Sequence, residues 1–264
     1  MRFVALLLSF VAVSQGETPV PVVVSAASPS IGVTADSLAS VYGDRLATKA
    51  ESAAGPPWPL ALGDIPGVRI TDAAGKTQDV ELLYVSPSQM NVHIPAGTAT
   101  GPATLAFPFT GLPPGQGTAA LRTVPVQIRQ VAPAIFSLNG SGSGVAAASA
   151  LRILPGGQLQ SPVPVFQCDS KGDCTAAPID TGLDTPVFLS LYGTGLRGAS
   201  SLAGVTVTIG GVPVQPTYAG PQNQIPGMDQ VNVPLPLSLR GKGLVEVTVT
   251  ADGVVSNAVQ IRIL

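Results

Sequence analysis

Apolar and polar residues alternate in short runs along most of the chain, and turn residues separate the runs. Between residues 243 and 250, every second residue from Val245 on is valine, and the residues between are charged or polar. This period of two is typical of a strand with one buried face. Gly210-Gly211 and Asp252-Gly253 follow such runs, and both pairs favour tight hairpin turns that need positive φ angles. The pattern predicts antiparallel sheets.

One motif occurs twice, because residues 89–95 and 230–236 both read Gln-x-Asn-Val-x-aliphatic-Pro. Other segments match in the same order: Tyr42-Gly43 with Tyr192-Gly193, and 126–129 with 259–262, which are both Val-Gln-Ile-Arg. The chain therefore contains an internal repeat, and the first copy carries additional residues, such as those from Thr110 to Gly117. The four amides of the repeated motif, Gln89, Asn91, Gln230 and Asn232, are expected to satisfy loop backbone, and a ligand role is the alternative.

Short strands with turn signals at this spacing indicate two sheets packed face to face. We predict an all-β protein of two tandem immunoglobulin-like β-sandwich modules, at 17–133 and 186–264. The 30 glycines and 26 prolines disfavour long helices. Residues 134–185 are expected to connect the modules. Within them, the Gly/Ser run at 139–144 is typical of a flexible linker, whereas 144–151 is apolar enough to add a strand to the second module.

The N-terminal residues have the pattern of an export signal. Met1-Arg2 is positively charged, Phe3 to Val13 is apolar apart from Ser9, and Ser14-Gln15-Gly16 offers small residues for cleavage. The apolar run is shorter than the roughly 20 residues that span a bilayer. We predict a signal peptide at 1–16, a secreted or cell-surface location, and no membrane insertion after signal cleavage. The chain has no Lys/Arg cluster and a net charge of −2, so nucleic acid is not an expected partner.

Cys168 and Cys174 are the only cysteines, and in an exported protein two nearby thiols are expected to form a disulfide. A zinc site needs two further ligands, and His93 is the only histidine. Asp169 and Asp173 lie in the same loop and carry oxygens that suit calcium, but their spacing fits no EF-hand, which favours a solvated turn. We predict no metal and no cofactor.

The sequence offers little for catalysis. A Ser-His-acid triad has to use His93, which lies in an alternating run as a surface or strand-filling residue, and Pro234 replaces it in the second copy. The 15 acidic residues are scattered singly, so no pair stands out for glycoside hydrolysis. We predict no catalytic residues and no enzymatic activity.

Trp58 lies in a proline-rich loop without an aromatic counterpart in the second copy. It either caps the core beneath its loop, which we favour, or stacks on a sugar or anchors a partner. Tyr42, Tyr84, Tyr192 and Tyr218 occur as matched pairs, which indicates a structural role.

Two further motifs suggest a family. Pro133-Ala134-Ile135-Phe136 precedes the Gly/Ser run, and residues 191–196 read Leu-Tyr-Gly-Thr-Gly-Leu. With the repeated motif, they resemble the IPT/TIG immunoglobulin-like fold. More closely, residues 22 to 264 look like the Solibacter-type uncharacterised C-terminal domain of large secreted bacterial proteins. The resemblance implies the fold and a secreted location, and it supplies no catalytic residues.

These observations predict an exported, non-enzymatic structural, adhesion or protein-interaction protein, whose partner at the cell envelope is an unknown protein or glycan. The alternative is a carbohydrate-binding accessory module that uses Trp58. A sugar-binding module should have two or three coplanar exposed aromatic rings. A structural module should have buried aromatic residues and edge strands that are open for pairing.

Overall fold

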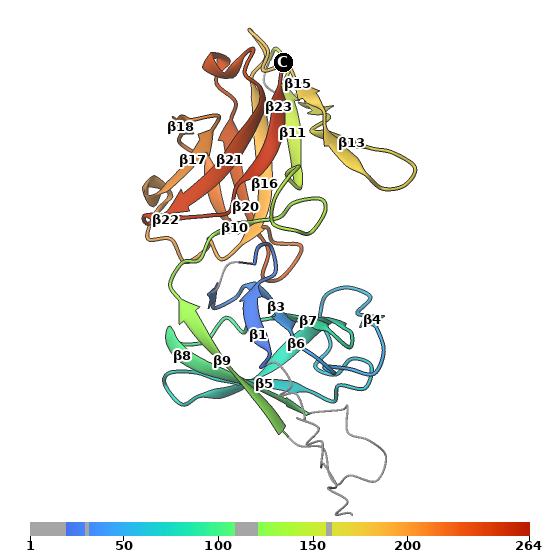
Figure 1. Cartoon of the computed structure of the whole chain (residues 1–264). Helices are drawn as coiled ribbons and strands as arrows, with labels where there is room; N and C mark the ends of the chain where they lie inside the picture. Colours follow the sequence, from blue (N-terminus) through green and yellow to red (C-terminus); the bar gives the residue numbers. More distant parts are fainter. Residues whose placement is uncertain (1–19, 30–31, 109–120, 157–159) are drawn as a thin grey trace, which may run out of the picture.

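The computed structural model describes residues 20–29, 32–108, 121–156 and 160–264, and these residues confirm an all-β fold. Among them, two short 3-10 helices, η1 (Leu202–Gly204) and η2 (Leu237–Leu239), accompany the strands. Two separate apolar cores form, one from residues between 23 and 128 and one from residues between 135 and 263. The chain is therefore two modules, which lie end to end (Figure 1). The predicted signal peptide and the insertion from Thr110 to Gly117 lie outside the described residues.

The first module is one sheet that is bent around its core. Its strands are β1 (Val22–Ser25), β2 (Val33–Thr34), β3 (Leu38–Tyr42), β4 (Glu51–Ser52), β5 (Val68–Thr71), β6 (Thr77–Val85), β7 (Gln89–His93), β8 (Gly101–Pro108) and β9 (Leu121–Arg129). The order is β1-β3-β7-β6-β5-β8-β9-β2, and β4 also pairs with β6. One end of β6 pairs with β7 and the other with β5, with a register shift between Leu82 and Tyr84. Both halves of the sheet bury side chains in the same core.

The second module packs two sheets face to face. Its strands are β10 (Ala134–Ile135), β11 (Ala148–Ile153), β12 (Gln160–Val163), β13 (Phe166–Cys168), β14 (Cys174–Ala176), β15 (Pro178–Ile179), β16 (Val187–Thr194), β17 (Val205–Ile209), β18 (Val212–Val214), β19 (Tyr218–Pro221), β20 (Asp229–Pro234), β21 (Gly243–Ala251), β22 (Val254–Val255) and β23 (Val259–Ile263). One sheet has the order β12-β11-β16-β20-β19, with β10 on β16. The other has the order β15-β23-β21-β17-β18, with β22 on β21, and β13-β14 is a separate hairpin.

Residues 134–185 belong to the second module rather than lying between the modules. They supply β10, β11 and β12 to one sheet and β15 to the other. The Gly/Ser run at 139–144 is a turn between β10 and β11, and the Asn257 side chain donates a hydrogen bond of 2.7 Å to the carbonyl of Gly142. The second core accordingly begins at Ile135.

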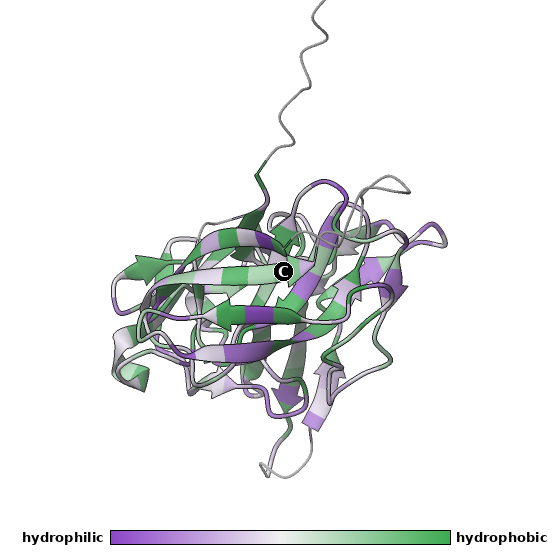
Figure 2. Cartoon of the chain, turned by 90° about the horizontal axis from the view of Figure 1, so that it is seen from below, coloured by the Kyte–Doolittle hydropathy of each residue, from purple (hydrophilic) through white to green (hydrophobic). Residues whose placement is uncertain are grey.

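Alternating burial along the strands follows the sequence pattern, and Figure 2 shows the same alternation of hydropathy. The ends of the two second-module sheets depart from the sequence expectation of open edges. The terminal strands of both strand orders contain prolines, Pro162 in β12, Pro221 in β19, Pro178 in β15 and Pro213 in β18, whereas the two-residue strands β10 and β22, which each have one partner, contain none. Proline lacks the N–H that a ladder needs, so these edges are poor templates for an added strand.

Candidate functional site

The link between the modules, residues 130–133, lies directly on the backbone of the second module. The Ala132 N–H donates to the carbonyl of Gly195 at 3.0 Å, and β10 continues as a partner of β16. A Cβ at Gly195 would lie 2.3 Å from the Ala132 carbonyl oxygen, and one at Gly198 would lie 2.0 Å from that of Gln130. The Gly-x-Gly-x-x-Gly spacing from Gly193 to Gly198 therefore makes room for the link.

Beside this link, a chain of ionisable side chains crosses from one module to the other. His93 Nδ1 lies 2.8 Å from Glu81 Oε2, and His93 Nε2 lies 2.8 Å from Asp36 Oδ1. The other oxygen of Asp36 accepts a hydrogen bond from Arg197 of the second module. Arg197 Nε donates in turn to Asp229 at 2.7 Å. We call these five residues the joint.

Local structure positions each member of the joint. Glu81 and His93 face each other in register on β6 and β7. Asp36 lies in the turn between β2 and β3 with a φ of 52°. Arg197 follows β16 in a turn, and Asp229 is the first residue of β20. The joint is thus held by strand register and turns rather than by neighbours in sequence.

Backbone contacts complete the joint. Thr194 Oγ1 accepts the N–H of Leu38 at 2.9 Å and donates to the carbonyl of Gly227 at 2.7 Å. Gly227 has a φ of 80°, and a Cβ there would lie 2.8 Å from Cδ2 of His93 and 2.9 Å from the Leu38 side chain. Gly227 of the second module therefore packs its backbone directly against the ring of His93.

Three members of the joint are largely removed from water, because the side chains of Asp229, His93 and Arg197 are 0, 11 and 14% exposed. The carboxylates of Asp36 and Glu81 are 31 and 33% exposed. Burial lowers the pKa of His93, but the hydrogen bonds to Asp36 and Glu81 outweigh it, so the pKa is raised from 6.5. The hydrogen bond from His93 lowers the pKa of Asp36, with help from Arg197. Complete burial raises the pKa of Asp229 despite the Arg197 guanidinium.

This geometry suits a structural connection rather than proton transfer. Both ring nitrogens of His93 are bound to carboxylates, so the ring is held as an imidazolium that donates twice. A triad histidine needs one nitrogen free to accept the proton of a nucleophile. The sequence correctly placed His93 in a strand but missed its partners. The only signal was that histidine stands where the second copy has Pro234.

The protonated His93 predicts a pH dependence of stability. Its folded-state pKa lies above the unfolded value of 6.5, so its contribution is complete below about pH 6.5 and is lost as pH rises through the folded-state pKa. We expect the free energy of unfolding, measured with urea, to fall as pH rises from 6 to 9. His93→Gln should flatten this slope. A wild-type curve that rises over this range, or an unchanged slope in His93→Gln, contradicts the assignment.

A cavity of about 460 Å³ lies beside the joint. It is lined by Asp36, Arg197, Pro56 and Pro57 from both modules, together with Pro221 and residues 223–226. The two charged groups of the lining are already paired with each other. The cavity therefore offers a ligand no uncompensated charge.

Trp58 follows these prolines but lies partly buried. Its Nε1 is enclosed, and no acceptor in the described part of the chain lies within hydrogen-bonding distance of it. A tryptophan that stacks on a sugar presents a ring face to water. Trp58 is not among the partly buried residues that pack against the first core, so the structure does not show it capping that core.

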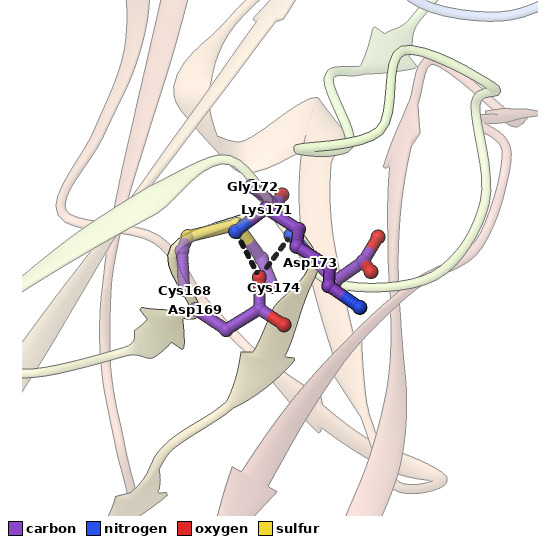
Figure 3. The surroundings of a disulfide bond; sticks show 6 residues. All are labelled: Cys168, Asp169, Lys171, Gly172, Asp173 and Cys174. Carbon is purple, nitrogen blue, oxygen red and sulfur yellow. Dashed lines mark hydrogen bonds between the residues drawn. A yellow bond between two sulfur atoms is a disulfide. The ribbon is translucent and has the colours of Figure 1, made fainter.

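The cysteines form the predicted disulfide, between β13 and β14. Asp169 Oδ1 accepts the N–H groups of Lys171 and Asp173 at 2.9 Å each, which closes the turn (Figure 3). Among the described residues, no three His, Cys, Asp or Glu side chains gather where a metal ion could be held. The Asp169 carboxylate thus serves the turn.

The sequence predicted that the amides of the repeated motif satisfy loop backbone. In the structure they bond to other side chains instead. Gln89 Nε2 donates to Asn91 Oδ1, and Gln230 Nε2 donates to Asn232 Oδ1, both at 2.7 Å. Each pair lies on the outer face of a sheet, because the alternate residues of the same strands are buried in the cores. Strand alternation could have indicated this placement.

Comparison with known proteins leaves the family open. No protein-family model matches this chain, and no curated protein matches it. The resemblance to the Solibacter-type domain and to IPT/TIG modules remains a prediction from the motifs. Within the described residues, no helix is long and apolar enough to cross a membrane.

Proposed function

We propose that the protein is an exported, non-enzymatic interaction element of the cell envelope, in which two IPT/TIG-like modules act as one fixed unit. The observation that carries this proposal is the joint. The side chains best suited to chemistry are His93, which uses both ring nitrogens, and Arg197, which uses each of its three guanidinium nitrogens, in hydrogen bonds where the two modules meet. A fixed orientation of two modules serves to present a surface to a partner.

Export is supported by two independent features. The N-terminal run from Met1 to Gly16 has the charge, apolar stretch and small residues of a signal peptide. The bond between Cys168 and Cys174 is compatible with an oxidising, extracytoplasmic compartment.

The mode of interaction follows from the strand edges and the sheet faces. Because the terminal strands β12, β19, β15 and β18 of the second-module sheets carry prolines, addition of a partner strand to them is disfavoured. Contact through side chains on the outer faces is the better-supported mode. The alternative, a carbohydrate-binding accessory module built on Trp58, has less support because the proline-rich loop that carries Trp58 contains no second aromatic ring.

Two measurements test this function. The chain expressed with residues 1–16 should reach the periplasm or the medium of a bacterial host, and the same chain without them should stay in the cytoplasm. Fluorescently labelled protein from residue 17 onward should bind envelope preparations of the producing cells saturably, and excess unlabelled protein should compete. Retention in the cytoplasm with residues 1–16 present, or envelope binding that unlabelled protein does not compete, contradicts the proposal.

A further inference from the structure

The repeated motif forms the same side-chain contact in both modules. In the second module, Asn232 Oδ1 accepts hydrogen bonds from Ser190 Oγ at 2.8 Å and from Gln230 Nε2 at 2.7 Å. In the first module, the equivalent residues are Asn91, Ser40 and Gln89, at 2.9 and 2.7 Å. The contact ties neighbouring strands together, but that role uses only part of what these side chains offer.

The double hydrogen bond fixes the orientation of both amides. Because Asn232 accepts twice through Oδ1, its Nδ2 is left as a donor, and because Gln230 donates through Nε2, its Oε1 is left as an acceptor. Neither atom has a protein partner among the described residues, and both side chains are half-buried on the outer face of β20. A donor and an acceptor therefore stand side by side, oriented before any ligand arrives.

Two tyrosines flank this amide pair. Tyr192 on β16 lies opposite Gln230, and Tyr218 on β19 lies opposite Asn232. The Tyr218 hydroxyl donates to the carbonyl of Pro221 at 2.5 Å, and the Tyr192 hydroxyl lies 3.0 Å from Ser149 Oγ. Both rings are thus tethered through their hydroxyl groups.

Gly220 makes the position of one ring possible. It lies opposite Gln230, and a Cβ built on it would lie 3.4 Å from Cζ of Tyr218 and 3.2 Å from its hydroxyl oxygen. The Tyr218 ring therefore lies along the sheet over bare backbone, beside the amide pair. Gly220 is itself buried, although it lies on the edge strand β19.

The first module also has two tyrosines beside its amides, because Tyr42 lies opposite Gln89 and Tyr84 lies opposite Asn91. Within the described residues, however, only the hydroxyl groups of Tyr192 and Tyr218 are held by hydrogen bonds. In the first module, Ser86 bonds to Gln89 at the strand end: its N–H donates to the Gln89 carbonyl at 2.7 Å, and its Oγ accepts the Gln89 N–H at 3.0 Å. Ser40 is only 2% exposed, whereas Ser190 is half-buried. The first copy thus offers an internal control in which the amide contact and the flanking tyrosines are present but the rings lack these hydroxyl tethers.

We propose that the outer face of β16, β20 and β19 binds a neutral polysaccharide through Asn232, Gln230, Tyr192 and Tyr218. None of these side chains is charged, so the face complements a ligand without charge. An adjacent donor and acceptor match the vicinal hydroxyl groups of a sugar, and an aromatic ring packs on the apolar face of a pyranose. Fixed orientation reduces the cost of binding. This inference rests on the proposed function and names the class of partner.

Native gel electrophoresis in gels that contain soluble neutral polysaccharides tests the proposal. The probes are a β-1,3-glucan, a xyloglucan, a galactomannan and a dextran. At least one should retard the wild-type protein. Asn232→Ala and Tyr218→Ala should each weaken the affinity derived from retardation at least tenfold. Asn91→Ala removes the equivalent contact from the first module and should leave retardation unchanged.

Thermal unfolding separates binding from structural damage. If the contact has only a structural role, Asn232→Ala and Asn91→Ala lower the melting temperature similarly and neither changes retardation, which overturns the proposal. Absence of retardation by every probe also overturns it. If envelope binding remains saturable in that case, the proposed function stands and only the sugar assignment fails. Loss of envelope binding by Asn232→Ala together with loss of retardation supports both.

Discussion

Arg197→Met is expected to lower the free energy of unfolding by about 3–5 kcal/mol, the usual cost of removing one partner from a buried ion pair. Asp229 is completely buried and would lose the guanidinium that faces it. The carbonyl of Met228 would lose a donor at 2.7 Å, and Asp36 would lose its connection to the second module. The same substitution should also loosen the contact between the modules.

Urea unfolding at pH 6 measures this effect, with two controls. Arg197→Met combined with Asp229→Asn should recover part of the loss, because the buried charge is then removed. Arg69→Met breaks an ion pair with Asp79 whose side chains are 70 and 57% exposed, and it should cost less than about 1 kcal/mol. Equal losses in Arg197→Met and Arg69→Met contradict the buried joint.

Gly195→Ala should cost about 3 kcal/mol, from two sources. Its φ of 79° is unfavourable for alanine by about 1–2 kcal/mol. A Cβ only 2.3 Å from the Ala132 carbonyl oxygen forces the link to move, and overpacking of this kind typically costs about 1–3 kcal/mol. The link is backbone and cannot rotate away as a side chain does.

Gly211→Ala is the matched control for this prediction. Gly211 has a φ of 81°, but a Cβ there would meet nothing within 4 Å. It should therefore show the conformational cost alone, about 1–2 kcal/mol. The difference in unfolding free energy between the two variants measures how firmly the link is held. If the variants lose the same amount, the link does not lie against Gly195.

Local features of the fold could be predicted because their causes are local. Valine at every second position marks β21 as a half-buried strand, and its alternating burial follows. Gly210-Gly211 and Asp252-Gly253 all have positive φ, as the hairpin signals require. The bridge between Cys168 and Cys174 was predictable because six positions separate the cysteines, with turn residues between them.

The joint could not be predicted because its members are distant in the sequence. Asp36 and Arg197 are 161 positions apart, and nothing near either residue indicates that they meet. The strand supplied by residues 134–135 was missed for a related reason. A two-residue strand has no periodicity, and its partner lies on β16. Gly193, Gly195 and Gly198 admit the link, and nothing near them in the sequence indicates which segment they lie against.

The amide motif was recognised as a repeat, but its contacts were not. Its residues bond across strands, Asn232 to Ser190 and Asn91 to Ser40, and strand register decides those pairs. The repeat itself therefore predicted equivalence between modules, whereas the structure was needed to show that the second copy holds its two tyrosines by their hydroxyl groups.

The central claim is that the joint holds the two modules as one rigid unit. Residual dipolar couplings of backbone amides, measured on the wild-type protein in a weakly aligning medium at pH 6, test it most directly. If the joint is rigid, a single alignment tensor fits the couplings of both modules. Tensors of clearly different magnitude for the two modules would show independent motion and would contradict a rigid joint.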